Sequence, residues 1–325
     1  MIYPWSIESW DTLQSKRERM PHALLIHGPE GIGKLKLAEH LAQSVLCEAV
    51  ADSGRPCGEC AGCRWFVVGS HPDFRLLEPE ALARPSGPGE DVEDLATTPA
   101  RGAKPSIEIK VDQVRALDGF LNLKSHRGGP RVALIHPAEA MNPNAANALL
   151  KGLEEPPGRA MFILVSHRPA RLLATIRSRC VAVPVPVPDP AAALAWLEKQ
   201  ELRDSGAWLA FASGSPLQAL AYAGEAAATV TRRRQALEAR DLGALGGVSD
   251  REQLEALAEV LQKHALDRAF AAYCGRSKYG TVGAPRAGAA WLRYARLLGR
   301  DRALARHPVN PRLFAAEMLK GMPEE

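Results

Sequence analysis

A short loop near the start of the chain has the spacing of the phosphate-binding P-loop, Gly-x-x-x-x-Gly-Lys-[Ser/Thr]. Glycines let backbone N–H groups curl around a phosphate, the helix N-terminus that follows adds positive potential, and the lysine reaches the outer phosphates. An apolar run at 23–26 precedes the loop and a helical pattern at 35–46 follows it, as the motif requires. The residues that we expect to contact a nucleotide are Gly28, Gly31, Gly33 and Lys34.

The rest of this nucleotide site departs from the pattern of an ATPase. Leu35 stands where a serine or threonine should hold magnesium. The apolar run 131–135 is typical of a buried parallel strand, which an ATPase follows with an aspartate for magnesium and a glutamate that activates water. His136 and Pro137 stand there instead, and Glu139 comes too late to replace the glutamate. We expect His136 to be an ordinary polar residue at a strand end, and binding of ATP or ADP to be weak.

Four cysteines form a second candidate site. Cys57, Cys60 and Cys63 have the spacing C-x-x-C-x-x-C, and Cys47 lies ten residues upstream of the first of them. Each C-x-x-C turn can point two sulfur atoms at one metal ion, so the cluster predicts a tetrahedral zinc site. Four thiolates leave no open coordination position, which indicates a structural role. Buried free thiols and an iron–sulfur cluster are the alternatives.

Length and composition are typical of a globular protein of two or three domains. The chain has 325 residues, of which 46% are hydrophobic and 24% charged. Its net charge of +4 is compatible with a nucleic-acid partner without indicating one. No apolar run approaches the ~18–20 residues of a membrane span, and residues 1–6 do not read as a signal peptide. We therefore expect a cytoplasmic protein, where its six cysteines would not form a disulfide framework.

Hydrophobic periodicity predicts an α/β region followed by helices. Asn142 and Pro143 are typical of a helix start, and Pro156 ends that helix. The segment 81–106 is rich in proline, glycine and small polar residues, and we expect a flexible surface insertion there. Further expectations are a helix over 6–20, strands at 73–77, 161–165 and 180–183, a proline-rich linker over 184–188, and helices after 189 with breaks at 214–216, 243–247 and 275–285.

Several elements resemble clamp-loader subunits of the AAA+ ATPase superfamily. The run 144–157 and the element Ser178-Arg179-Cys180 are similar to signatures of those subunits. The cysteines stand where bacterial clamp-loader subunits carry a zinc module inserted after the P-loop helix. The run 310–314 resembles the last helix of the delta-prime subunits of bacterial DNA polymerase III. The resemblance covers most of the chain outside the segment 81–106.

The departures from the ATPase pattern indicate which branch of the family the chain resembles. Motor subunits keep the residues that Leu35, His136 and Pro137 replace, and they carry a lid arginine that the turn 214–218 does not offer. Ser178-Arg179-Cys180 is intact. This combination resembles delta-prime, the subunit that does not hydrolyse ATP, and an ATP-hydrolysing motor subunit of the gamma/tau type is the alternative.

The resemblance also implies an architecture and partners. It implies an AAA+ α/β P-loop module over 1–186 with the zinc module at 47–63, then an all-α lid over 187–230 and an all-α collar domain over 231–325. The collar would join a ring of subunits. The partners implied are gamma/tau and delta and, through them, the sliding clamp and primed DNA. Arg179 would serve a neighbour's nucleotide site as an arginine finger, whereas Arg177 has the features of a surface arginine.

A third hypothesis is a zinc-dependent nucleic-acid-binding protein with a vestigial nucleotide fold. The cysteine segment has no basic run, and its aromatic residues are confined to Trp65 and Phe66. Proteins that read nucleic acid directly usually display a basic patch or stripe. Direct binding of DNA by this segment is therefore not favoured.

Overall fold

The computed structural model describes residues 2–49, 54–83, 105–224, 227–239, 241–245, 247–275, 277, 287–305, 307 and 309–323. The chain divides into two compact units, Met1–Ala192 and Ala193–Glu325. Most of the insertion expected at 81–106, and most of the break expected at 275–285, lie outside the described residues. No helix among the described residues has both the length and the apolar character that crossing a bilayer would need.

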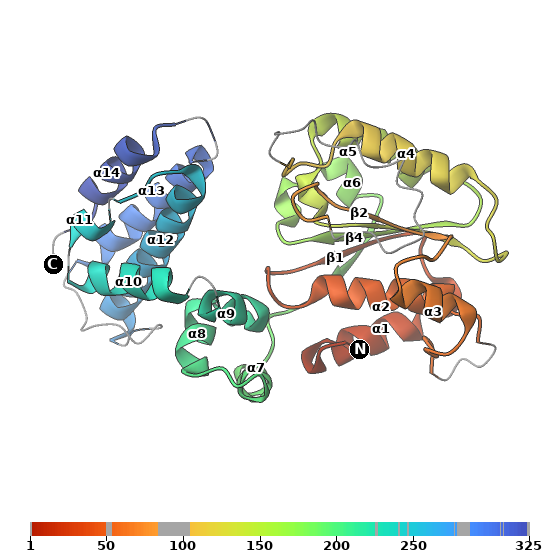
Figure 1. Ribbon diagram of the computed structural model, residues 1–325, viewed down its shortest axis with the longest axis horizontal. Helices are drawn as coiled ribbons and strands as arrows, with labels where there is room; N and C mark the ends of the chain where they lie inside the picture. The colour runs from red at the N-terminus through yellow and green to blue at the C-terminus, as the bar shows by residue number, and fades with distance from the viewer. Residues whose placement is uncertain are drawn as a thin grey trace. The chain divides into compact units, whose positions relative to one another are not determined.

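A parallel five-stranded sheet forms the centre of the first unit, in the order β2-β3-β4-β1-β5 (Figure 1). All residues of β3 and β4 are buried, as expected of central strands that are covered on both faces. The linker expected to start at Pro184 begins one residue later, because Pro184 ends β5 in register with His27. A proline is tolerated there because β5 is an edge strand. The strands are β1 (Ala23–His27), β2 (Phe74–Leu77), β3 (Arg131–Ile135), β4 (Ala160–Ser166) and β5 (Val181–Pro184).

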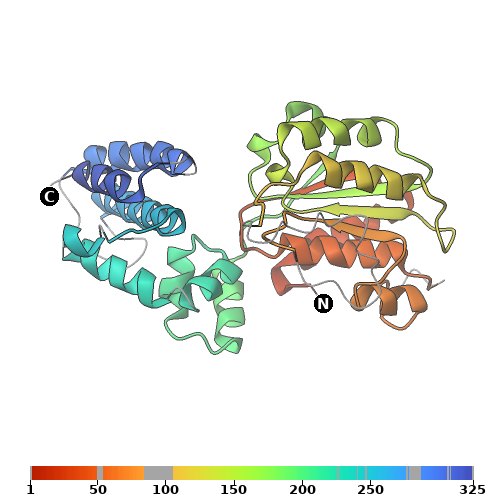
Figure 2. The same ribbon diagram turned by 45° about the horizontal axis from the view of Figure 1, so that its top comes forward.

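Helices cover both faces of this sheet (Figures 1 and 2). One face carries α1 (Ile7–Ser15), α2 (Lys34–Leu46) and α3 (Ala61–Val67), and the other carries α4 (Val111–Asn122), α5 (Pro143–Glu154) and α6 (Ala174–Arg177). The helix expected over 6–20 is shorter, because 3-10 turns flank α1 and Arg17 turns toward α2. There its guanidinium donates to the hydroxyl of Ser44 at 2.7 Å and to that residue's carbonyl oxygen at 2.8 Å.

The second unit is helical within its described residues, as the sequence predicts. The break expected over 243–247 contains the short helix α11, because Leu245 and Val248 are buried in the same hydrophobic cluster. One cluster joins α7 to α9, and another joins α10 to α14. The division of this region into lid and collar stays a prediction. The helices are α7 (Pro190–Lys199), α8 (Ser205–Phe211), α9 (Pro216–Ala223), α10 (Ala227–Glu238), α11 (Leu242–Leu245), α12 (Arg251–Cys274), α13 (Gly288–Leu304) and α14 (Pro311–Lys320).

A buried ion pair fixes the loop between α4 and β3. Asp73 is 1% exposed and Arg131 is 5% exposed, and Arg131 Nε lies 3.4 Å from Asp73 Oδ1. Burial lowers the pKa of the Arg131 guanidinium, and the carboxylate of Asp73 opposes that change. Hydrogen bonds to the Asp73 carboxylate come from the Ser125 hydroxyl and the backbone N–H groups of His126 and Arg127.

Replacing Asp73 with alanine should lower the free energy of unfolding by about 3–5 kcal/mol, because the Arg131 charge would stay buried without its partner. Urea denaturation followed by circular dichroism measures the loss. Asp112→Ala is the control, because its ion pair with Arg115 has both side chains more than 70% exposed. That change should cost less than about 1 kcal/mol. Equal losses in the two variants would contradict a special role for the buried pair.

Candidate functional site

The P-loop residues predicted from the sequence come together between β1 and α2. Gly28, Gly31 and Gly33 all have positive φ values, 153°, 77° and 86°. A Cβ atom at Gly28 would lie 2.2 Å from the carbonyl oxygen of Val185, which follows β5. Glycine is therefore required at this position by both backbone conformation and space.

An aromatic segment at the start of the chain packs on this loop. The rings of Tyr3 and Trp5 stack with centroids 5.0 Å apart, and Trp5 Nε1 donates a hydrogen bond to the Ile32 carbonyl oxygen at 2.8 Å. The Tyr3 ring lies against Gly33, where a Cβ atom would come within 2.3 Å of it. Sequence reasoning missed this contact, because no local pattern links residues 3–5 to a loop some 30 positions away.

Lys34 is engaged within its own chain. Its side chain is 2% exposed, and its ammonium group donates to the carbonyl oxygen of Pro29. Burial lowers the pKa of Lys34 to about 8, while the carboxylates of Glu139 and Glu30 act in the opposite direction. Leu35, the next residue, is partly buried in the cluster beneath α2 and brings no oxygen toward the loop.

Polar groups that follow β3 and β4 lie next to the loop at the same edge of the sheet. His136 Nδ1 lies 2.9 Å from Glu78 Oε1, so His136 is a paired strand-end residue as predicted. Its ring contacts that of His167, with centroids 5.3 Å apart. Burial lowers the pKa of His167 to about 3, which leaves this imidazole neutral at pH 7. Glu139 Oε1 accepts a hydrogen bond from the His167 backbone N–H at 2.9 Å.

Glu139 and His167 are the site residues that sequence reasoning did not assign. Among the described residues, Glu139 Oε2 and His167 Nδ1 are both buried and have no hydrogen-bond partner. The Glu139 carboxylate instead interacts electrostatically with Lys34. The only signal that could have identified them is their position just after the buried strands β3 and β4, whose carboxyl ends share one edge of the sheet.

The four predicted cysteines also come together. Their sulfur atoms all lie within 4.8 Å of one another, with 3.9 Å between Cys57 and Cys63 and 4.0 Å between Cys47 and Cys60. Zinc–sulfur bonds of about 2.3 Å in a tetrahedron place the sulfur atoms about 3.8 Å apart. The cluster could therefore hold a metal ion. The backbone N–H of Cys60 is the largest of the causes that lower the pKa of the Cys57 thiol to about 6.

Helix ends and a neighbouring loop position this cluster. Cys47 follows α2 directly, and Cys60 caps α3 by accepting a hydrogen bond from the Cys63 backbone N–H. The loop that Asp73 orders carries Arg127, whose guanidinium makes two hydrogen bonds to the Glu48 carboxylate, at 2.7 and 3.1 Å. The cysteine segment is thus attached to the main sheet independently of any metal.

Arg179 lies away from the P-loop. It is in the turn between α6 and β5, two residues before Val181, where β5 begins. Because β5 and β1 run parallel, this turn is at the amino end of the sheet, whereas the P-loop follows the carboxyl end of β1. Arg179 Nη1 donates to the Thr175 carbonyl oxygen at 2.9 Å, and Nη2 pairs with the Glu154 carboxylate. The sheet therefore separates Arg179 from its own chain's nucleotide loop.

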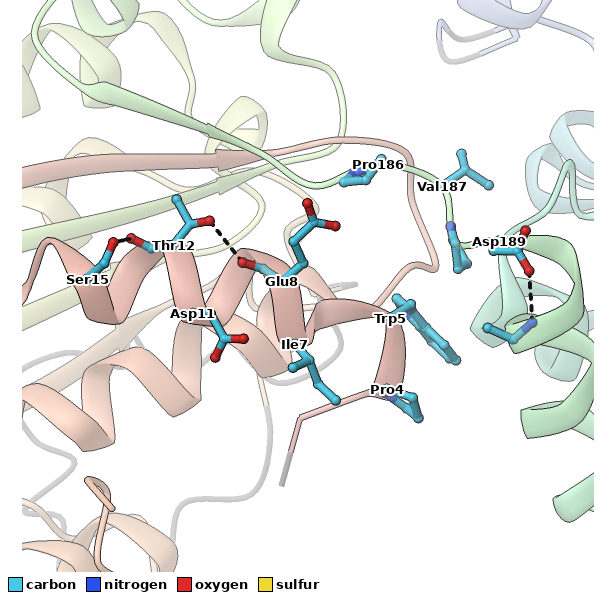
Figure 3. A pocket seen from close by; sticks show the side chains of 12 residues that line it. Pro4, Trp5, Ile7, Glu8, Asp11, Thr12, Ser15, Pro186, Val187 and Asp189 are labelled. Atoms are coloured by element: carbon cyan, nitrogen blue, oxygen red, sulfur yellow. Dashed lines mark hydrogen bonds between the residues drawn. The ribbon is translucent and has the colours of Figure 1, made fainter. Parts of the chain in front are cut away.

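A groove of about 740 Å³ lies between α1 and the segment that follows β5 (Figure 3). Trp5, Ile7 and Val187 form part of its apolar wall, and Glu8, Asp11 and Asp189 add three carboxylates. Lys34 does not line it. A groove of this charge disfavours phosphate groups, so it is not the nucleotide site.

Comparisons with known proteins agree with the resemblance seen in the sequence. Residues 7–189 match the family described as DNA polymerase III, delta subunit. A DNA polymerase III subunit delta' of Pseudomonas aeruginosa is 44% identical over 223 residues, which are 67% of this chain and 60% of that protein. The corresponding subunit of Escherichia coli is 34% identical over 224 residues, with the same shares of the two chains.

The matches cover only part of each relative. The chain spans about three fifths of the length of the curated delta' relatives named above, 60% in both cases. A DNA polymerase III subunit tau of Salmonella typhimurium is 32% identical over 163 residues, which are 50% of this chain but only 21% of that protein.

Proposed function

The chain belongs to the DNA polymerase III delta-subunit family, alongside its delta' members, and we propose that it is the clamp-loader subunit that does not hydrolyse ATP. In this role it is a scaffold within a ring of subunits and supplies an arginine finger to a neighbour. The partners we propose are gamma/tau and delta and, through them, the sliding clamp and primed DNA, in the cytoplasm. The lid over 187–230 and the collar over 231–325 are part of the same proposal.

One observation carries this proposal. The catalytic positions at the carboxyl edge of the sheet hold Leu35, His136 and Pro137, whereas Arg179 stays intact at the amino edge. A side chain at the amino edge cannot reach the chain's own P-loop across the strands. An arginine there is suited to a nucleotide held by another subunit, because a guanidinium has a fixed charge and a planar fork of donors that match phosphate oxygens.

The chain's own nucleotide site supports the non-hydrolysing role. We propose that Gly28, Gly31, Gly33 and Lys34 bind ATP or ADP weakly. A phosphate would have to compete for Lys34 with the Pro29 carbonyl oxygen and with the charge of Glu139. It would also have to approach a loop on which the ring of Tyr3 is already packed.

The isolated chain should show no ATP turnover above background, because no hydroxyl at Leu35 and no carboxylate at His136 or Pro137 can place magnesium or activate water. A coupled phosphate-release assay with magnesium and ATP measures the rate, with Lys34→Ala as the control for a contaminating ATPase. A turnover that Lys34→Ala abolishes would instead favour a motor subunit of the gamma/tau type. The similarity of this chain to a tau subunit is the observation behind that alternative.

We also propose that Cys47, Cys57, Cys60 and Cys63 hold a structural zinc ion. Thiolate ligands, sulfur separations close to those of a tetrahedron and backbone N–H groups directed at the sulfur atoms all support zinc. The ion would link the end of α2 to the start of α3, and it would contribute no open position for catalysis.

Purified protein should contain one equivalent of zinc, which metal analysis measures without chelator in the buffers. Cys60→Ser should remove it and unfold this segment, because structural zinc contributes on the order of 10 kcal/mol to local folding. Cys274→Ser is the matched control, since Cys274 is exposed and outside the cluster. A protein that contains no zinc, or a Cys60→Ser variant that retains it, would contradict the zinc site.

Arg179→Ala should leave assembly of the clamp loader intact. It should lower the rate at which the complex hydrolyses ATP in the presence of clamp and primed DNA. Arginine fingers increase kcat by a factor of roughly 10³–10⁵ in nucleotidases. Arg177→Ala is the control, because Arg177 is the exposed last residue of α6, two positions before Arg179. Normal hydrolysis in a complex that contains Arg179→Ala would mean that the chain is a scaffold only.

A further inference from the structure

Glu154 is the carboxylate that pairs with Arg179, and its position on α5 is costly for a structural residue. It is the last residue of α5, where the carbonyl ends of the helix disfavour a negative charge. Its side chain is 49% exposed and that of Arg179 is 34% exposed, and exposed ion pairs contribute little to stability. Fold stability therefore does not explain an acid at this place.

The backbones beneath the two side chains are fixed. Two residues before Glu154, Gly152 packs so closely on β4 that a Cβ atom would lie 3.0 Å from Phe162 Cζ. On the other side, the Arg179 backbone N–H donates to the carbonyl oxygen of Ile176, a fully buried residue, at 3.1 Å. The ion pair thus joins two rigid supports, α5 and the α6–β5 turn.

The contacts of Arg179 occupy only part of its guanidinium. Nη1 donates to the Thr175 carbonyl oxygen and Nη2 forms an ion pair with the Glu154 carboxylate, while the side chain keeps about a third of its surface in solvent. A guanidinium has further N–H donors that stay available for phosphate oxygens. Arg177 differs, because no ion pair or hydrogen bond of its side chain is found among the described residues.

We propose that Glu154 is a positioning residue that holds Arg179 in the conformation that meets the neighbour's nucleotide. This inference rests on the proposed arginine finger and adds a residue to it. A free arginine side chain samples many rotamers, so reaching a phosphate requires ordering it during the reaction. The carboxylate orders it beforehand, which raises the fraction of Arg179 that is ready to stabilise charge in the transition state.

The test uses the reconstituted clamp loader with clamp, primed DNA and ATP, and it measures kcat and KM for hydrolysis. Glu154→Ala should lower kcat about tenfold and leave KM unchanged, because the lost interaction acts in the transition state. Glu155→Ala is the matched control, since Glu155 is the adjacent, exposed acid and forms no ion pair among the described residues. It should hydrolyse ATP at the normal rate.

The double variant Glu154→Ala/Arg179→Ala decides whether the acid acts through the arginine. If it does, the double variant hydrolyses ATP at the same rate as Arg179→Ala alone. The positioning role is overturned if Glu154→Ala lowers the rate of the Arg179→Ala complex by the same factor as it lowers the wild-type rate. It is also overturned if kcat is normal in Glu154→Ala and low in Arg179→Ala. Either result leaves the arginine finger in place. Normal hydrolysis by Arg179→Ala overturns the finger itself and the positioning role with it.

Discussion

The parallel pairing of β1, β3, β4 and β5 is the constraint on which the functional regions of the first unit depend. Because these strands run in one direction, the segments after β1, β3 and β4 all emerge at one edge, and the α6–β5 turn lies at the other. The register places Leu24 opposite Ile163, and side chains buried on the two faces of the sheet fix it. The sheet thereby decides which residues can share a site and which cannot.

At the carboxyl edge the chain provides its own partners for Lys34, the residue that we propose would contact a phosphate. A buried lysine is costly unless its charge finds partners, and Lys34 has the Pro29 carbonyl oxygen and the charge of Glu139. The imidazole of His167 is kept neutral by burial, so it adds no positive charge beside Lys34. The loop therefore keeps the backbone conformation of a P-loop, while groups of the same chain interact with the charge of Lys34.

Whether the sequence predicts a feature of the fold or the site depends on how far apart in the chain the contacting residues are. The cysteine spacing, the Asn142 cap and the glycines of the loop are local patterns, and the structure places them as expected; the Asn142 side chain accepts a hydrogen bond from the Ala145 backbone N–H at 2.8 Å. The packing of Tyr3 on Gly33 and the partnerships of Glu139 and Glu154 join segments far apart in the chain. No periodicity encodes such contacts, so they required the fold. The short α1 has the same cause, since Arg17 bonds to α2.

The course of α5 offers a reason why a chain that we propose does not hydrolyse ATP keeps the nucleotide-binding fold. The helix starts from the loop after β3, where the Asn142 backbone N–H donates to the Ile109 carbonyl oxygen, and it ends at Glu154 beside Arg179. A helix of this length spans about 18 Å. One rigid element therefore connects the two edges of the sheet. Leu153 of α5 and Ile176 of α6 are buried in one cluster, against which Cys180 packs, whereas Ile32 of the P-loop is buried in the cluster that also holds α2. In the proposed function, hydrolysis places no demand on Leu35 and His136, but an arginine finger for another subunit still requires the sheet and the helices that hold Arg179.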